Sequence, residues 1–161
     1  MRLIYLFLFL FGTLALTGQE KLEFKPQQVV LAVQDVEQTA KWYVEFLDFE
    51  LGKSFTVPKA GLEGRIVRKG DFEVMFMRGR EMQPLPNHRQ STFTDLATVG
   101  TKRIAFAVAD LTRFAARLRE RGVPFDVEPQ LFADPDTGLR FNWLVIRDIE
   151  GNLIEFMELL E

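Results

Sequence analysis

The chain has 161 residues, 47% of them hydrophobic and 27% charged, as is usual for one globular domain or for two small modules sharing a core. Its formal net charge of −3 provides no basic surface for nucleic acid, so we expect no nucleic-acid partner. The sequence contains no cysteine, which excludes disulfides, thiolate metal sites and cysteine nucleophiles.

The N-terminus differs in character from the rest of the chain. Met1 and Arg2 precede an almost wholly apolar run over residues 3–16. This run is shorter than the ~20 residues of a membrane-spanning helix, but it suits the core of a signal peptide. We predict a cleaved signal peptide over residues 1–18 and a polar lead-in over residues 19–26. The mature protein would then be exported, periplasmic or extracellular, with no stable membrane anchor; an uncleaved N-terminal anchor is the alternative.

The first module, residues 27–78, begins with a predicted strand and helix. Residues 29–33 are apolar and largely β-branched, which favours a strand. Asp35 is typical of a helix N-cap, and Gln38 stands three residues later, as in a capping box. The helix has an apolar face of Val36, Ala40, Tyr43 and Leu47. Turn residues then separate three further predicted strands, over residues 49–57, 62–68 and 72–78.

A long connection leads to a second copy of this plan. Residues 79–100 contain prolines and the only histidine, His88, and a connection of this length predicts a mobile lid. Residues 101–161 then repeat an apolar strand, a helix capped by Asp110, and three strands over residues 125–132, 139–147 and 153–159. The chain is therefore predicted to be an α+β protein built from two βαβββ modules.

These elements resemble the vicinal oxygen chelate superfamily, which includes glyoxalase I, bleomycin-resistance proteins, extradiol dioxygenases and methylmalonyl-CoA epimerase. The resemblance covers residues 27–158 and is most specific in VQDVEQTAKWYVEFLDFELG (33–52), AFAVADL (105–111) and DIEGNLIEF (148–156). The family usually has proline at the position of Ile149. The resemblance implies that the two modules form one cup-shaped mixed sheet, with helices on the outside and a ligand in the cup, and it is compatible with a homodimer.

In the metal-dependent relatives, four positions on the cup floor hold a divalent ion, and the resemblance places them at Gln28, Met75, Arg103 and Glu155. Gln28 and Glu155 offer oxygen ligands. Arg103 has only hydrogen-bond donors, and the thioether of Met75 is too soft for the ions that this family uses. We therefore predict that the metal site has been lost, and we expect no metal and no cofactor.

Two of these positions have competing interpretations. Arg103 either binds an anionic group of a ligand or forms a salt bridge with Glu155 in place of the lost ion, and both roles are compatible. Glu155 is the candidate catalytic residue, as a general base. A neighbouring arginine should lower rather than raise its pKa, which argues against that role.

The remaining candidates are placed by the alternation of strand residues. Glu73, Met75 and Met77 share one face, where the methionines either form an adaptable apolar pocket or fill a shallow cavity. Trp143 either lines the cup or seals the core. His88 fits a solvated loop residue better than a catalytic base.

The leading functional hypothesis is an exported, metal-independent small-molecule binder similar to the bleomycin-resistance branch. Its candidate ligand-binding residues are Gln28, Glu73, Met75, Met77, Arg103, Trp143 and Glu155. Because they combine a cation with methionine side chains, we expect a ligand with an anionic group beside an apolar body. An enzyme of glyoxalase, isomerase or lyase type is the alternative. A third hypothesis is an interaction module whose cup no longer binds a ligand.

Overall fold

The computed structural model describes residues 25–160, and the predicted signal peptide lies outside them. The first module consists of β1 (Gln28–Ala32), α1 (Val36–Leu47), β2 (Glu50–Val57), β3 (Leu62–Lys69) and β4 (Phe72–Arg78). The second consists of β5 (Arg103–Ala107), α3 (Leu111–Glu120), β6 (Phe125–Ala133), β7 (Arg140–Arg147) and β8 (Leu153–Leu159). The predicted α+β class and the two βαβββ modules are confirmed. No helix within residues 25–160 has the length and apolar character of a membrane span.

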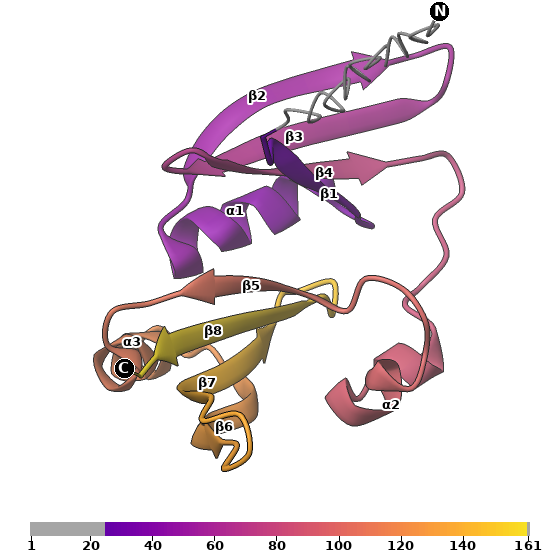
Figure 1. Cartoon of the computed structure of the whole chain (residues 1–161). Helices are drawn as coiled ribbons and strands as arrows, with labels where there is room; N and C mark the ends of the chain where they lie inside the picture. The colour runs from indigo at the N-terminus through magenta and orange to yellow at the C-terminus, as the bar shows by residue number, and fades with distance from the viewer. Residues whose placement is uncertain (1–24, 161) are drawn as a thin grey trace, which may run out of the picture.

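The strands form two sheets of the same topology. Their orders are β1-β4-β3-β2 and β5-β8-β7-β6, with β1–β4 and β5–β8 parallel and the other neighbours antiparallel. In the single chain there are thus two four-stranded sheets instead of one continuous cup-shaped sheet. Helix α1 lies between the first sheet and the second module (Figure 1), and not on the outside as expected.

The helices begin where the sequence predicts. Asp35 Oδ1 accepts a hydrogen bond from the Gln38 amide at 2.9 Å, and Asp110 Oδ1 accepts one from the Arg113 amide at 2.8 Å. Each bond satisfies a backbone donor that the first helical turn leaves free. Helix α1 buries the predicted apolar face of Val36, Ala40, Tyr43 and Leu47.

One hydrophobic core extends through both modules. The ring of Phe106 on β5 lies 6.1 Å from that of Phe49 and 5.4 Å from that of Phe72, measured between centroids. At the same junction the Tyr43 hydroxyl donates to Asp148 Oδ2 at 3.2 Å. The apolar face of α1 packs on its own sheet, where the centroid of the Tyr43 ring lies 4.9 Å from that of Phe76. The end of α1 also contacts the second module, because Arg121 Nη1 donates to the Phe46 carbonyl oxygen at 2.9 Å. These contacts hold α1 between the two modules.

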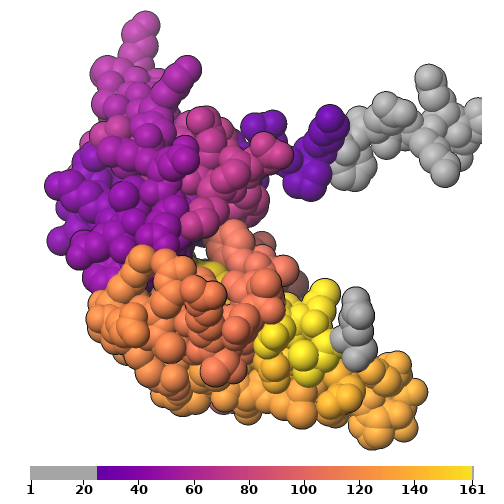
Figure 2. All heavy atoms as spheres, turned by 90° about the vertical axis from the view of Figure 1, so that its left-hand side faces the viewer, coloured from indigo at the N-terminus to yellow at the C-terminus, as the bar shows by residue number. Residues whose placement is uncertain are grey.

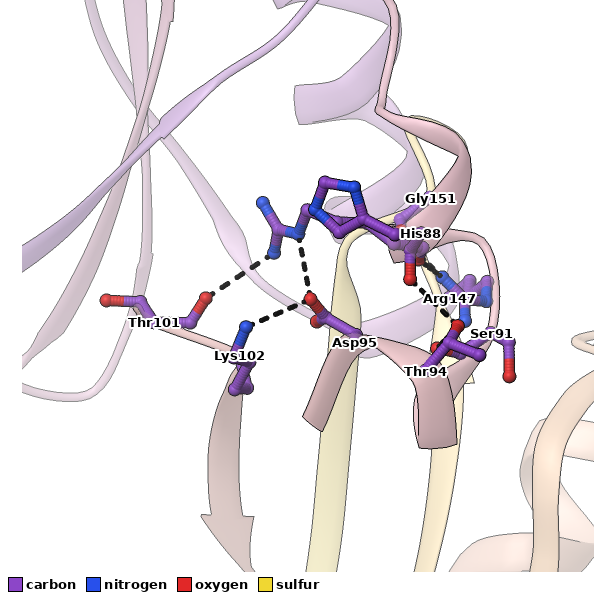
Figure 3. Close-up of polar contacts among 9 residues, drawn as sticks. His88, Ser91, Thr94, Asp95, Thr101, Lys102, Arg147 and Gly151 are labelled. Atoms are coloured by element: carbon purple, nitrogen blue, oxygen red, sulfur yellow. Dashed lines mark hydrogen bonds and ion pairs between the residues drawn. The ribbon is translucent and has the colours of Figure 1, made fainter. Parts of the chain in front are cut away.

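The predicted lid contains two short helices, η1 (Asn87–Arg89) and α2 (Thr92–Leu96), that pack on the second module (Figure 3). Asp95 is only 1% exposed. Its Oδ1 lies 3.3 Å from Arg89 Nε and 3.1 Å from Lys102 Nζ. Burial by itself raises the pKa of Asp95, but its bonds to Lys102 and Arg89 outweigh this effect and hold the pKa below its usual value. The segment is thus anchored by buried charge, and its mobility stays a prediction.

Candidate functional site

The four candidate residues of the first module lie on one face of its sheet. The β1–β4 register pairs Gln28 with Glu73, and strand alternation adds Met75 and Met77. The intervening residues of β4 are fully buried on the opposite face, towards α1. Val30, on the candidate face, is 49% exposed. This face therefore combines the polar Gln28 and Glu73 with an apolar part that the single chain leaves partly open.

The three candidates of the second module also share a face, on the side of the sheet opposite α3. Arg103 Nε lies 2.8 Å from Glu155 Oε2, and the guanidinium carbon lies 5.8 Å from the centroid of the Trp143 ring. The predicted ion pair is thus present. Arginine has five N–H donors, and its side chain here is 26% exposed, so donors remain for a ligand. Ion pair and anion binding are compatible at this residue.

The prediction for the pKa of Glu155 is wrong in direction. Glu155 is only 6% exposed, and this burial raises its pKa, while the charge of Arg103 lowers it by less. The prediction took account of the cation and not of the desolvation of the carboxylate. A raised pKa moves the carboxyl group closer to the range in which a general base is effective.

The two sets of candidates lie on separate sheets, and no hydrogen bond or ion pair within residues 25–160 links one set to the other. The four positions implied for a divalent ion are split in the same way. Arg103 pairs with Glu155, and the described part of the chain brings no three carboxylate, imidazole or thiolate side chains together as metal ligands. Two of the four side chains, those of Arg103 and Met75, are poor ligands for the divalent ions of this family.

Sequence reasoning missed Arg147, which lies on the same face as Trp143. Arg147 Nε binds Asp126 Oδ1 at 2.7 Å, and Nη1 donates to the carbonyl oxygens of Arg89 and Gly151 (Figure 3). Strand alternation could have indicated this position, because Arg147 lies four residues after Trp143 on β7 and so shares its face. Its partners could not be predicted, because Arg89 reaches it only through the docking of η1. His88, on η1, is exposed, as predicted.

Three comparisons place the chain among known proteins. It is 30% identical over 100 residues to "Uncharacterized protein slr0090" of Synechocystis sp. (strain ATCC 27184 / PCC 6803 / Kazusa), covering 59% of this chain but only 28% of that protein. The glyoxalase family protein from Enterococcus faecalis has a TM-score of 0.65 and 21% identity, over 83% of this chain and 97% of its own. The V278E glyoxalase I mutant from Zea mays has a TM-score of 0.60 and 18% identity, over 81% of this chain and 43% of its own.

These solved structures establish the fold, and the sequence establishes the family. The profile of the Glyoxalase/Bleomycin resistance protein/Dioxygenase superfamily matches residues 25–156, most of the chain. The chain therefore belongs to this superfamily.

Proposed function

We propose that the protein is a metal-independent binder of small molecules that takes a ligand with an anionic group beside an apolar body. The observation that carries this proposal is the position of Arg103, at 2.8 Å from Glu155 and 5.8 Å from the centre of the Trp143 ring. Arg103 and Glu155 stand at two of the positions that hold the ion in metal-dependent relatives. A fixed cation there disfavours a divalent ion and favours an anion.

The surroundings of Arg103 support an anionic ligand. Glu155 uses one edge of the guanidinium, and the exposed remainder provides paired N–H donors that match a carboxylate or phosphate. Trp143 offers an aromatic surface beside the charge. A ligand with an apolar body would therefore contact the ring while its anionic group binds Arg103.

A second copy of the chain would complete the binding cup. In one chain, Gln28, Met75 and Met77 lie on a different sheet from Arg103, and the partly exposed Val30 lies among them. If the first sheet of one copy faced the second sheet of another, all seven candidates would line a common space. We therefore propose a homodimer, which sedimentation velocity of the mature protein would detect.

The remaining features of the proposal follow from the sequence. Export rests on the apolar run over residues 3–16, and the proposed independence from metal resembles the bleomycin-resistance branch. The intact mass of protein recovered from its native cell envelope or medium should correspond to a start between residues 16 and 19. Protein recovered from the cytosol with Met1 still present would contradict export.

One observation favours an enzyme as the second candidate function. Burial raises the pKa of Glu155, so this carboxyl group is better suited to accept a proton than the sequence indicated. An isomerase or lyase that uses Glu155 as a base would lose activity in Glu155→Gln. The Arg103 side chain would still bind the substrate in that variant.

A thermal-shift screen of small carboxylates and phosphates with matched neutral analogues would test the binding proposal. We expect hits among anions with an apolar body, and Arg103→Ala should weaken them by about tenfold or more, as expected of a residue at an interaction hot spot. Arg113→Ala is the matched control, because Arg113 is an exposed arginine outside the candidate site. Hits that are all cationic, or the absence of any anionic hit that Arg103→Ala weakens, would refute the proposal.

A further inference from the structure

A cavity of about 200 Å³ lies between the two modules, on the helix side of the sheets. It is formed by the end of α1 and the two residues after it, the end of β3, the end of β5, α3 and β8. Figure 2 shows a hollow on this side of the molecule, where the first module meets the second. Arg103 projects from the opposite face of β5, so this cavity is separate from the candidate cup.

The cavity has an aromatic wall. Its phenylalanines are Phe46, Phe49, Phe106, Phe114 and Phe156, and the rest of its apolar lining is Leu47, Ala107, Val108 and Leu118. The centroid of the Phe156 ring lies 4.4 Å from that of Phe114 and 5.7 Å from that of Phe106. Since a cavity of about 150 Å³ lined by such residues stays dry and binds benzene, this one has room for a single substituted aromatic ring.

Cations predominate at the polar edge of the cavity, where Lys69, Arg117 and Arg121 accompany a single carboxylate, that of Asp48. Arg121 Nη2 binds Asp48 Oδ1 at 2.8 Å, so Asp48 is already neutralised by one partner. Arg117 lies farther from Asp48, at 3.2 Å, and its side chain is 55% exposed. Lys69 Nζ donates only to the carbonyl oxygens of Leu47 and Asp48, at 3.0 and 2.9 Å.

We propose that this cavity is a second ligand site, which binds a small aromatic carboxylate. The ring would lie among the phenylalanines, and the carboxylate would bind Arg117 and Lys69 at the edge. The excess of cations disfavours an amine in the same position. Because the lining comes from both modules, an occupant would also stabilise their packing against each other.

The test uses 4-fluorophenylacetate as the probe, with 4-fluorobenzyl alcohol and 4-fluorobenzylamine as neutral and cationic counterparts. Binding is followed by fluorine NMR and by methyl NMR of the mature protein. We expect saturable binding of the carboxylate, with shifts at the methyl groups of Val108 and Leu118 but not at Val30 on the other face of the first sheet. The alcohol should bind more weakly, and the amine most weakly.

Three variants assign the site. Arg117→Gln should weaken binding of the carboxylate about fivefold, as expected for loss of one partly exposed ion pair. Arg113→Gln removes the same charge from the same helix outside the cavity and should change nothing. Val108→Phe should fill the cavity and abolish binding; if this variant does not fold, Arg117→Gln still decides.

Arg103→Ala separates this site from the cup, because it should leave the shifts that 4-fluorophenylacetate causes at Val108 and Leu118 unchanged. The inference is overturned if Arg103→Ala abolishes the shifts at Val108 and Leu118, if the shifts map only to the methyl groups of Val30, or if no probe binds at millimolar concentration. Equal binding of the carboxylate and the amine, unaffected by Arg117→Gln, would overturn it as well. None of these results depends on whether the cup has a ligand of its own.

Discussion

The hydrogen bond between Tyr43 and Asp148 joins the two modules, and Tyr43→Phe would remove it while keeping the ring. Tyr43 is 0% exposed, and its hydroxyl donates to Asp148 Oδ2 at 3.2 Å. Asp148 keeps three other donors, the amides of Glu150 and Asn152 and the side-chain amide of Asn152. A hydrogen bond to a charged group contributes about 1.5–3 kcal/mol. This bond is long, and Asp148 keeps its other hydrogen bonds in the variant. We therefore expect Tyr43→Phe to lower the free energy of unfolding by about 1–2 kcal/mol.

The destabilisation by Tyr43→Phe should depend on pH, because Asp148 can be protonated. Burial raises the pKa of Asp148, and its hydrogen bonds, including the one from Tyr43, oppose this rise. A carboxyl group with a raised pKa contributes stability that is present below its unfolded pKa and is lost as the pH rises through its folded pKa. Because the Tyr43 hydroxyl favours the charged form, Tyr43→Phe raises the folded pKa of Asp148 further. The destabilisation should therefore be larger at neutral pH than in acid, where Asp148 is protonated.

Urea unfolding at neutral pH and at about pH 4 measures the loss in the free energy of unfolding and its dependence on pH. The m-value, the slope of this free energy against urea concentration, should not change. In an Asp148→Asn background, Tyr43→Phe should have a smaller effect, because the charged acceptor is gone. A loss below about 0.5 kcal/mol at neutral pH, or a loss equal at both pH values, would refute this account of the junction.

Three further predictions concern the cup and the connecting segment. Asp95→Asn should destabilise the protein by about 1–3 kcal/mol and speed hydrogen exchange in α2 but not in β1; equal exchange in the variant and the natural protein would contradict the anchoring role. In the proposed homodimer, which would bring the two sets of candidates together, Met75→Glu with Arg103→His should gain one divalent ion per chain, measured by elemental analysis after dialysis; one ion per chain in the natural protein would overturn our interpretation of Arg103. Gly64→Val should lower the melting temperature, because a Cβ at Gly64 would lie 2.3 Å from the Phe55 ring; an unchanged melting temperature would show that this ring moves freely.

Local features of the fold were predictable because they depend on residues close together in the chain. The caps at Asp35 and Asp110 were predicted from a short polar residue before a helical apolar pattern, and both form the expected bond. The family resemblance placed Arg103 and Glu155 together on the cup floor, and their ion pair is present. Strand alternation likewise placed Met75 and Met77 on one face.

The tertiary structure decided how these parts meet. Periodicity shows that a helix has an apolar side, but not which surface covers it, so the packing of α1 against the second module and the division into two sheets were not predictable. The connecting segment also contacts the second module through Arg147, which donates to the carbonyl oxygen of Arg89, 58 residues away in the chain. The direction of the pKa shift of Glu155 was likewise decided by the tertiary structure. Its charged neighbour was visible in the sequence, but the burial that outweighs it depends on packing by residues distant in the chain.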